Sequence, residues 1–277
     1  MNGVWPIAVY TWREGMRKKT LIGFLILSIL VIAGAGFMTA YMQETSVGET
    51  KTDVDLKLIK DICVTAVSIF GVLITIFISA AAVPTEVDNK VIYTVLSKPV
   101  RRWQYLLGKF TGIQMIVLIN LALMGGLFAA VVYLKQPAGE RVFPTLLMWS
   151  IGLTYLEFLV VSAFTFAISC TSTSSVLPTL GGLFIYVTGH LTEYLKDVYE
   201  RGGQTTTFLD NMIKQIAYGL YLVLPNLDNF SLKDQILSLP INDPPRDTQI
   251  PNLVLYGFIY VVAGYIMAYW IFRRKEL

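Results

Sequence analysis

The sequence has few charged residues and very few residues of the kinds that bind metal ions. It contains one histidine and two cysteines among 277 residues, and Asp, Glu, Lys and Arg make up 15% of it, compared with about 25% in soluble domains. A single histidine excludes the H-E-x-x-H zinc-protease motif and haem ligation by paired histidines. Two scattered cysteines make no metal cluster. We therefore expect no enzymatic activity, no cofactor and no metal site in this chain.

Apolar residues, in contrast, make up 55% of the sequence. A water-soluble fold of this size cannot bury so much apolar surface with so few charges, so a membrane is the expected environment. A helix of about 20 apolar residues crosses a hydrocarbon core about 30 Å thick. Six runs reach about this length, at residues 21–41, 62–83, 110–134, 145–170, 176–195 and 252–272. They predict an all-α integral membrane protein with six transmembrane helices, forming a single domain over residues 1–277.

Residues 1–20 mix aromatic with basic side chains, such as Trp5 and Trp12 with Arg13 and Arg17. This composition predicts an interfacial amphipathic helix that lies among the lipid headgroups before the first span. A loose basic tail is the alternative, because chain termini are often poorly ordered.

The distribution of positive charge predicts the topology. With both termini cytoplasmic, the cytoplasmic segments hold 12 Lys and Arg residues and the two short outer loops hold 5. Such an excess is the rule for cytoplasmic loops, so we expect a multi-pass protein of the cell membrane. The basic residues then serve orientation and contact with membrane lipid, and no nucleic acid partner is expected. Cys63 and Cys170 fall at opposite sides of the bilayer, too far apart for a disulfide.

Residues 84–109, between the second and third predicted spans, are rich in both charge and apolar side chains. Their pattern predicts two short amphipathic pieces separated at Pro99, because proline disfavours helical conformation in the residue before it. A stiff cytoplasmic segment of this kind suits docking to a soluble partner. A basic loop that only follows the charge rule is an equal alternative.

Three parts of this segment resemble the coupling region of ABC-2 permeases, the membrane subunits of ATP-binding-cassette transporters. They are Glu86, the run Leu96-Ser-Lys-Pro-Val-Arg101 and the run Tyr105-Leu-Leu-Gly-Lys109. In that family this region contacts the ATPase. The resemblance implies coupling roles for Glu86, Lys98, Pro99, Arg101, Arg102, Tyr105 and Lys109.

The resemblance further implies a half-transporter that forms a homodimer or heterodimer and works with a separate ATP-binding-cassette ATPase subunit. It would alternate as a rigid body between inward-open and outward-open states, in the direction of export. The segment Leu222-Val-Leu-Pro-Asn-Leu-Asp-Asn-Phe230 also resembles the branch of these permeases that serves maturation of multi-copper enzymes such as nitrous oxide reductase.

The chain carries no ATP-binding loop of its own. A P-loop around Gly108-Lys109 would need glycine at position 103 and serine or threonine at position 110. The sequence has Trp103 and Phe110 there. The ATPase must therefore be another polypeptide.

Glu157 lies in the middle of the fourth predicted span, where a carboxylate costs at least about 2.5–3.5 kcal/mol. It shares a polar stripe with Thr154, and Asn120 lies at a similar depth in the third predicted span. One interpretation is that these three residues line a substrate path or a dimer seam. The alternative is that Glu157 hydrogen-bonds to Asn120 or another neighbour and only holds helices together.

The connection at residues 196–251 is long for a compact protein. We expect it on the outer face, where it either caps the exit of the pathway, meets an external partner, or forms an interfacial helix with no further role.

Two other functions compete with an ATP-driven permease: a self-sufficient secondary carrier or channel, and a membrane scaffold that recruits a cytoplasmic protein. A carrier would be expected to bury more ionisable residues than Glu157 alone and often to show inverted repeats. A neighbouring gene for a stand-alone ATPase would favour the permease. Amphiphilic molecules, ions, sulfur or copper species and peptides all fit as substrates.

Overall fold

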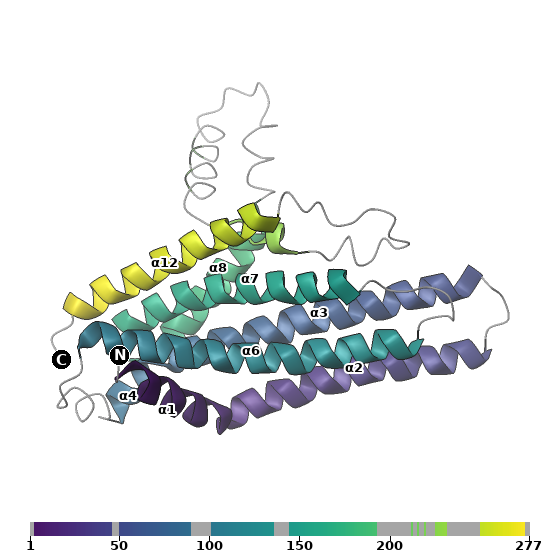
Figure 1. Ribbon diagram of the computed structural model, residues 1–277, viewed down its shortest axis with the longest axis horizontal. Helices are drawn as coiled ribbons and strands as arrows, with labels where there is room; N and C mark the ends of the chain where they lie inside the picture. The colour runs from purple at the N-terminus through teal and green to yellow at the C-terminus, as the bar shows by residue number, and fades with distance from the viewer. Residues whose placement is uncertain are drawn as a thin grey trace.

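The computed structural model describes residues 3–45, 50–89, 101–135, 144–192, 225–231 and 250–274, and three single residues between 212 and 219. Every regular element in these ranges is a helix, which confirms the predicted all-α class (Figure 1). The α-helices are α1 (Val4–Met16), α2 (Lys19–Thr45), α3 (Thr50–Ala81), α4 (Pro84–Asp88), α6 (Arg102–Lys135), α7 (Pro144–Thr171), α8 (Val176–His190) and α12 (Ile250–Arg274). A short 3-10 helix, η1 (Asp228–Phe230), precedes α12.

Five of these helices, α2, α3, α6, α7 and α12, are long and apolar enough to cross a membrane. Large apolar side chains such as Leu30, Leu123 and Phe258 are exposed on them, as expected where lipid replaces water. The chain is thus a multi-pass membrane protein. The sixth apolar helix, α8, has 15 residues and is about 22 Å long. Residues 193–195 of the predicted fifth span lie outside the described residues.

The bundle is organised around α7, which packs against α12, α3, α8 and α6. Its side chains Phe158, Val160 and Phe166 are fully buried. Close packing is helped by small residues: a Cβ atom on Gly71 of α3 would lie 2.4 Å from the Phe158 ring, and one on Gly264 of α12 would lie 3.0 Å from the Ala163 Cβ. Such contacts let neighbouring membrane helices approach closely.

The N-terminal helix α1 packs along the beginning of α6. Gly108 and Gly112 lie one turn apart on α6 and form the contact surface. A Cβ atom on Gly108 would lie 2.8 Å from the Val4 carbonyl oxygen, and one on Gly112 would lie 2.7 Å from the Ala8 carbonyl oxygen. The structure thus fixes α1 to a membrane-spanning helix, and the headgroup location predicted for residues 1–20 stays a prediction.

Between α3 and α6 the structure describes residues up to 89 and again from 101. The helix α6 runs without a break from Arg102, so the amphipathic piece predicted at residues 101–109 is the beginning of the long helix. The piece predicted before Pro99 lies largely outside the described residues.

Candidate functional site

The first candidate site is a buried ion pair where α3, α4 and α6 meet. The Lys109 Nζ atom lies 2.6 Å from the Glu86 Oε1 atom, and the two side chains are 2% and 4% exposed. The Tyr105 hydroxyl donates a hydrogen bond to the other carboxylate oxygen of Glu86. Lys109 also donates to the Ala82 carbonyl oxygen at 3.0 Å. We call Glu86, Tyr105 and Lys109 the joint cluster.

Local sequence explains why these side chains meet. The helix α4 begins at Pro84, which lacks an N–H group and so fits the first position of a helix. Glu86 then falls in the first turn of α4, where the helix dipole favours a negative charge. The Ala82 carbonyl follows the last residue of α3 and would otherwise lack an intrahelical partner. Lys109 of α6 therefore neutralises the Glu86 carboxylate in the first turn of α4. It also binds the carbonyl oxygen that follows the end of α3.

The joint cluster holds three helices in one fixed arrangement. A buried ion pair is kept in place because removing either partner leaves a charge unpaired in a medium of low dielectric constant, at a cost of about 3–5 kcal/mol. The three side chains face into the protein and offer no surface to a partner in this conformation.

The other predicted coupling residues are placed differently. Arg101 is exposed, and its backbone N–H donates to the Gln104 Oε1 atom at 3.1 Å at the beginning of α6. Arg102 is half-buried, and its Nη1 atom donates to the Arg273 carbonyl oxygen at 3.0 Å. This bond brings a positive charge to the C-terminal end of α12, which the helix dipole favours. Lys98 and Pro99 lie outside the described residues.

The second candidate site contains Glu157 on α7. Its Oε1 atom lies 3.0 Å from the Nε2 atom of His190 at the end of α8. The other ring nitrogen of His190, Nδ1, lies 3.6 Å from the Asp228 Oδ1 atom on η1. The Tyr186 ring meets the imidazole edge-on, with the ring centroids 4.7 Å apart. We call Asp228, His190 and Glu157 the histidine cluster.

The other two residues predicted with Glu157 take no part in this cluster. Asn120 is buried, and its Nδ2 atom donates to the Ile116 carbonyl oxygen of its own helix at 2.8 Å. Of the partners considered for Glu157, Asn120 or another neighbour, the structure gives another neighbour, His190. Thr154 is half-buried.

Sequence reasoning missed His190 and Asp228 as partners of Glu157. Two features of the sequence could have indicated these partners. One is that the chain has a single histidine, and the other is the segment of residues 222–230, which is singled out only for its resemblance to the maturation permeases. It also missed Gln114, whose Nε2 atom donates to the Ser162 Oγ atom at 2.6 Å between α6 and α7.

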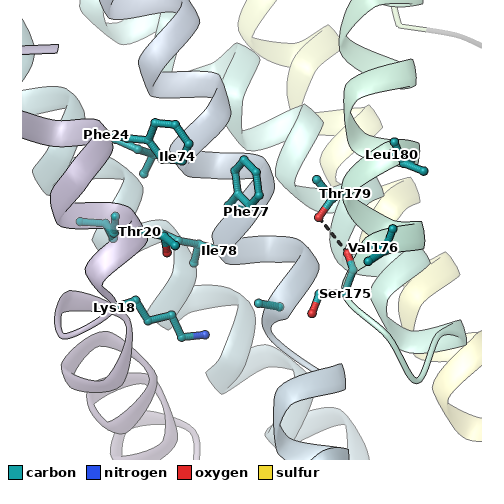
Figure 2. A pocket seen from close by; sticks show the side chains of 12 residues that line it. Lys18, Thr20, Phe24, Ile74, Phe77, Ile78, Ser175, Val176, Thr179 and Leu180 are labelled. Atoms are coloured by element: carbon teal, nitrogen blue, oxygen red, sulfur yellow. Dashed lines mark hydrogen bonds between the residues drawn. The ribbon is translucent and has the colours of Figure 1, made fainter. Parts of the chain in front are cut away.

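The third feature is an apolar groove of about 370 Å³ between α2, α3 and α8. Figure 2 shows Lys18 and Ser175 at one end of it and Phe24, Ile74 and Leu180 at the other. The pKa of Lys18 is lowered, mainly because burial disfavours the charged ammonium group, while Glu14 opposes the shift. The groove therefore combines apolar walls with one basic group at its end.

Comparison with known proteins gives one family. Its sequence model, described as an ABC-2 family transporter protein, matches residues 5–277. The match covers every helix described above apart from Val4, the first residue of α1. It also covers the joint cluster, the histidine cluster and the apolar groove. No curated protein matches the chain.

Proposed function

The chain belongs to the ABC-2 family of transporter proteins and is thus a permease of an ATP-binding-cassette transporter; from this premise we propose that a separate ATPase subunit drives it and that it exports its substrate across the cell membrane. The observation that supports the proposed coupling is the joint cluster. It ties the region that resembles the ATPase-contacting segment to three helices through a buried ion pair of 2.6 Å.

The proposed mechanism begins at the exposed Arg101. An ATPase that binds near residues 84–109 would displace the beginning of α6 when it binds or hydrolyses ATP. Because Lys109 holds Glu86 and the Ala82 carbonyl, α3 and α4 would move together with α6. Packed cores respond to such displacement as rigid bodies.

Two further contacts extend this rigid body to the last helix. Arg102 binds the Arg273 carbonyl oxygen, and the Tyr265 hydroxyl donates to the Trp103 carbonyl oxygen at 3.1 Å. The Tyr105 and Phe272 rings also stack, with centroids 5.7 Å apart. The end of α12 is therefore fixed to the beginning of α6, and we expect both to follow the ATPase.

We further propose that two permease chains, identical or different, form the complete pathway. One face of α8 carries Val176, Leu180, Phe184 and Val187, and all four side chains are exposed. Together with the neighbouring groove, this face offers an apolar surface to a second permease. The apolar walls of the groove favour an apolar or amphiphilic substrate, and the likeness to maturation permeases stays a prediction.

The test is charge reversal at the surface of the coupling region. In the double variant Arg101→Glu with Arg102→Glu, we expect stimulation of the ATPase by the permease to fall at least about tenfold, equivalent to about 1.4 kcal/mol of lost interaction. The permease should still insert in the membrane, because neither side chain belongs to the joint cluster. The measurement is the ATP hydrolysis rate of the co-reconstituted subunits.

The matched control is Arg101→Gln with Arg102→Gln, which removes the charges without reversing them and should give an intermediate rate. Normal stimulation in the reversed variant would contradict the proposed coupling. Transport without nucleotide would support the secondary carrier, and ATPase binding without any transport would support the scaffold.

A further inference from the structure

The histidine cluster places three protonatable groups in a row from three separate elements. Asp228 belongs to η1, His190 to the end of α8 and Glu157 to the middle of α7. The two ring nitrogens of His190 face the two carboxylates, at 3.0 Å on the Glu157 side and 3.6 Å on the Asp228 side. The imidazole therefore lies between the two carboxylates, within hydrogen-bond distance of Glu157 and slightly beyond it from Asp228.

The row runs from the surface into the protein. The side chain of Asp228 is 47% exposed, that of His190 is 29% exposed and that of Glu157 is 5% exposed. The exposed fraction thus rises from Glu157 to Asp228, which makes Asp228 the end of the row where a proton would enter, and the other end is a carboxyl group in the interior of the bundle. An intramembrane ionisable residue with such a connection is a candidate for proton transfer.

The backbone of residues 225–231 is held in place for this contact. The Leu227 N–H donates to the Gly189 carbonyl oxygen at 3.1 Å, and the Asn226 N–H donates to the Tyr256 hydroxyl at 2.9 Å. A Cβ atom on Gly189 would lie 2.6 Å from the Leu227 side chain. Asp228 is therefore fixed beside His190 by contacts that do not involve its carboxylate.

The row lies away from the joint cluster. Tyr256, near the beginning of α12, contacts the segment that carries Asp228. Arg273, at the other end of α12, contacts Arg102. These two positions are 17 residues apart, which corresponds to about 25 Å of helix, so the two clusters lie at different depths of the bundle.

The charged groups that act on His190 are Glu157 and Asp228. Tyr186, on the same helix, touches the imidazole with its ring edge. The carboxylates approach opposite nitrogens and do not converge on one point. In the part of the chain that the structure describes, no group of three His, Cys, Asp or Glu residues is arranged to hold a metal ion. The ligand that this arrangement fits is a proton.

An imidazole can pass a proton between its two nitrogens. A proton taken up by the Asp228 carboxylate moves to Nδ1 when the 3.6 Å separation shortens or a water molecule bridges it, and the proton on Nε2 moves to the Glu157 carboxylate. One proton enters at Nδ1 and one arrives at Glu157, and the ring is left in its other tautomer. The first tautomer returns when Nδ1 releases its proton and Nε2 takes up another. A neutral imidazole donates one hydrogen bond only, so it cannot satisfy both carboxylates at once unless a further proton is bound.

We propose that Asp228, His190 and Glu157 form a proton-binding relay, through which Glu157 exchanges a proton with the membrane side opposite the C-terminus. Permease movement would then be linked to the uptake or release of a proton at Glu157. This activity is separate from the ATPase coupling proposed above and can be tested without the ATPase.

The test uses the full chain in sealed phosphatidylcholine vesicles, with the pH of each side set independently. The probe is dicyclohexylcarbodiimide, an apolar reagent that modifies protonated carboxyl groups, and mass spectrometry measures its product on Glu157. We expect the labelling rate to fall about tenfold per pH unit above its midpoint. It should follow the pH on the side opposite the C-terminus. Glu157→Gln should abolish the product.

Two variants break the relay. His190→Gln has no second nitrogen to pass a proton on, and we expect its labelling to respond at least about tenfold more slowly to a pH jump on that side. Asp228→Asn changes an exposed side chain, should fold normally and should slow the response by a smaller factor, because His190 is itself 29% exposed. Tyr186→Phe keeps the ring contact and should behave like the wild type.

Three results would overturn the proposal. They are wild-type labelling that ignores pH or follows the pH on the C-terminal side, a wild-type response in His190→Gln, and a response lost equally in Tyr186→Phe. Each would show that Glu157 does not exchange its proton through His190 with the side opposite the C-terminus.

Discussion

Two buried glutamates of this protein have contrasting surroundings. Glu86, in the joint cluster, is paired with Lys109 at 2.6 Å, and both side chains are almost completely buried. Glu157, in the histidine cluster, is equally buried, but its partner His190 is partly exposed and leads to the exposed Asp228. One carboxylate is enclosed and the other is connected to the surface.

The difference shows how one bundle can give two buried acids different tasks. An ion pair that is shielded from water does not exchange protons with it and keeps a fixed geometry. Such a geometry suits the transmission of movement between helices. A carboxylate linked to water through an imidazole can change its protonation state, which suits a reversible binding step. Both clusters join separate helices, so the contrast lies in solvent access.

The largest effect should come from Lys109→Met. It leaves Glu86 buried without a counter-charge, so we expect the free energy of unfolding to fall by about 3–5 kcal/mol. The double variant Glu86→Gln with Lys109→Met leaves no charge unpaired and should recover most of this loss. Chemical unfolding in detergent measures both variants.

The matched control for this prediction is the half-buried pair of Glu14 and Lys18, at 3.9 Å. Glu14→Gln should change the free energy of unfolding by less than about 1 kcal/mol. If Lys109→Met is no more damaging than Glu14→Gln, the joint cluster does not hold the helices together.

A smaller effect should come from glycines beside the two clusters. In Gly112→Ala the new Cβ would lie 2.7 Å from the Ala8 carbonyl oxygen. In Gly189→Ala it would lie 2.6 Å from the buried Leu227 side chain and 3.2 Å from the Pro225 carbonyl oxygen. Because backbone yields less readily, Gly112→Ala should lose about 1–3 kcal/mol of unfolding free energy, and Gly189→Ala should lose less. Thermal unfolding of the purified variants measures the order.

Gly126 on α6 provides the control, because a Cβ atom there would meet nothing within 4 Å. Gly126→Ala should be neutral or more stable by up to about 1 kcal/mol, since alanine favours helix. Equal losses in Gly112→Ala and Gly126→Ala would show that α1 is not held by close packing on α6.

The smallest effect on stability should come from Glu157. Glu157→Gln keeps a side chain that can hydrogen-bond to His190, and Glu157→Ala loses that bond, which in membrane proteins is worth about 0.6–1.7 kcal/mol. We expect Glu157→Ala to lose about this amount and Glu157→Gln to lose less. Transport by both variants, compared at equal folded yield, then separates a pathway role from a structural one. Normal transport by Glu157→Ala would exclude a polar wall at this position.

The helices could be predicted from the sequence because a membrane-spanning helix follows from a local property, the length of an apolar run. The family resemblance likewise rests on the sequence itself. Side-chain contacts between residues far apart in the sequence could not be predicted. Glu86 and Lys109 were both singled out for coupling, but nothing in their spacing showed that they form an ion pair.

The same reason explains the outcome for Glu157. Sequence position gives the depth of a residue along a helix but not the direction in which its side chain points relative to other helices. Asn120 was predicted at a similar depth, yet its amide bonds to its own helix. The partner proved to be His190, which reaches Glu157 because α8 ends beside the middle of α7.

We expect an ATPase to bind the end of the bundle that carries Arg101. The direct measurement uses a maleimide photo-crosslinker on Arg101→Cys or Tyr133→Cys. Arg101 directly precedes α6 and Tyr133 lies near its end, about 48 Å away along the helix. Both positions are exposed, and the native Cys63 and Cys170 are fully buried. We expect crosslinks to an ATP-binding-cassette ATPase from position 101 and none from position 133. Crosslinks to the ATPase from position 133, or from neither position, would contradict it.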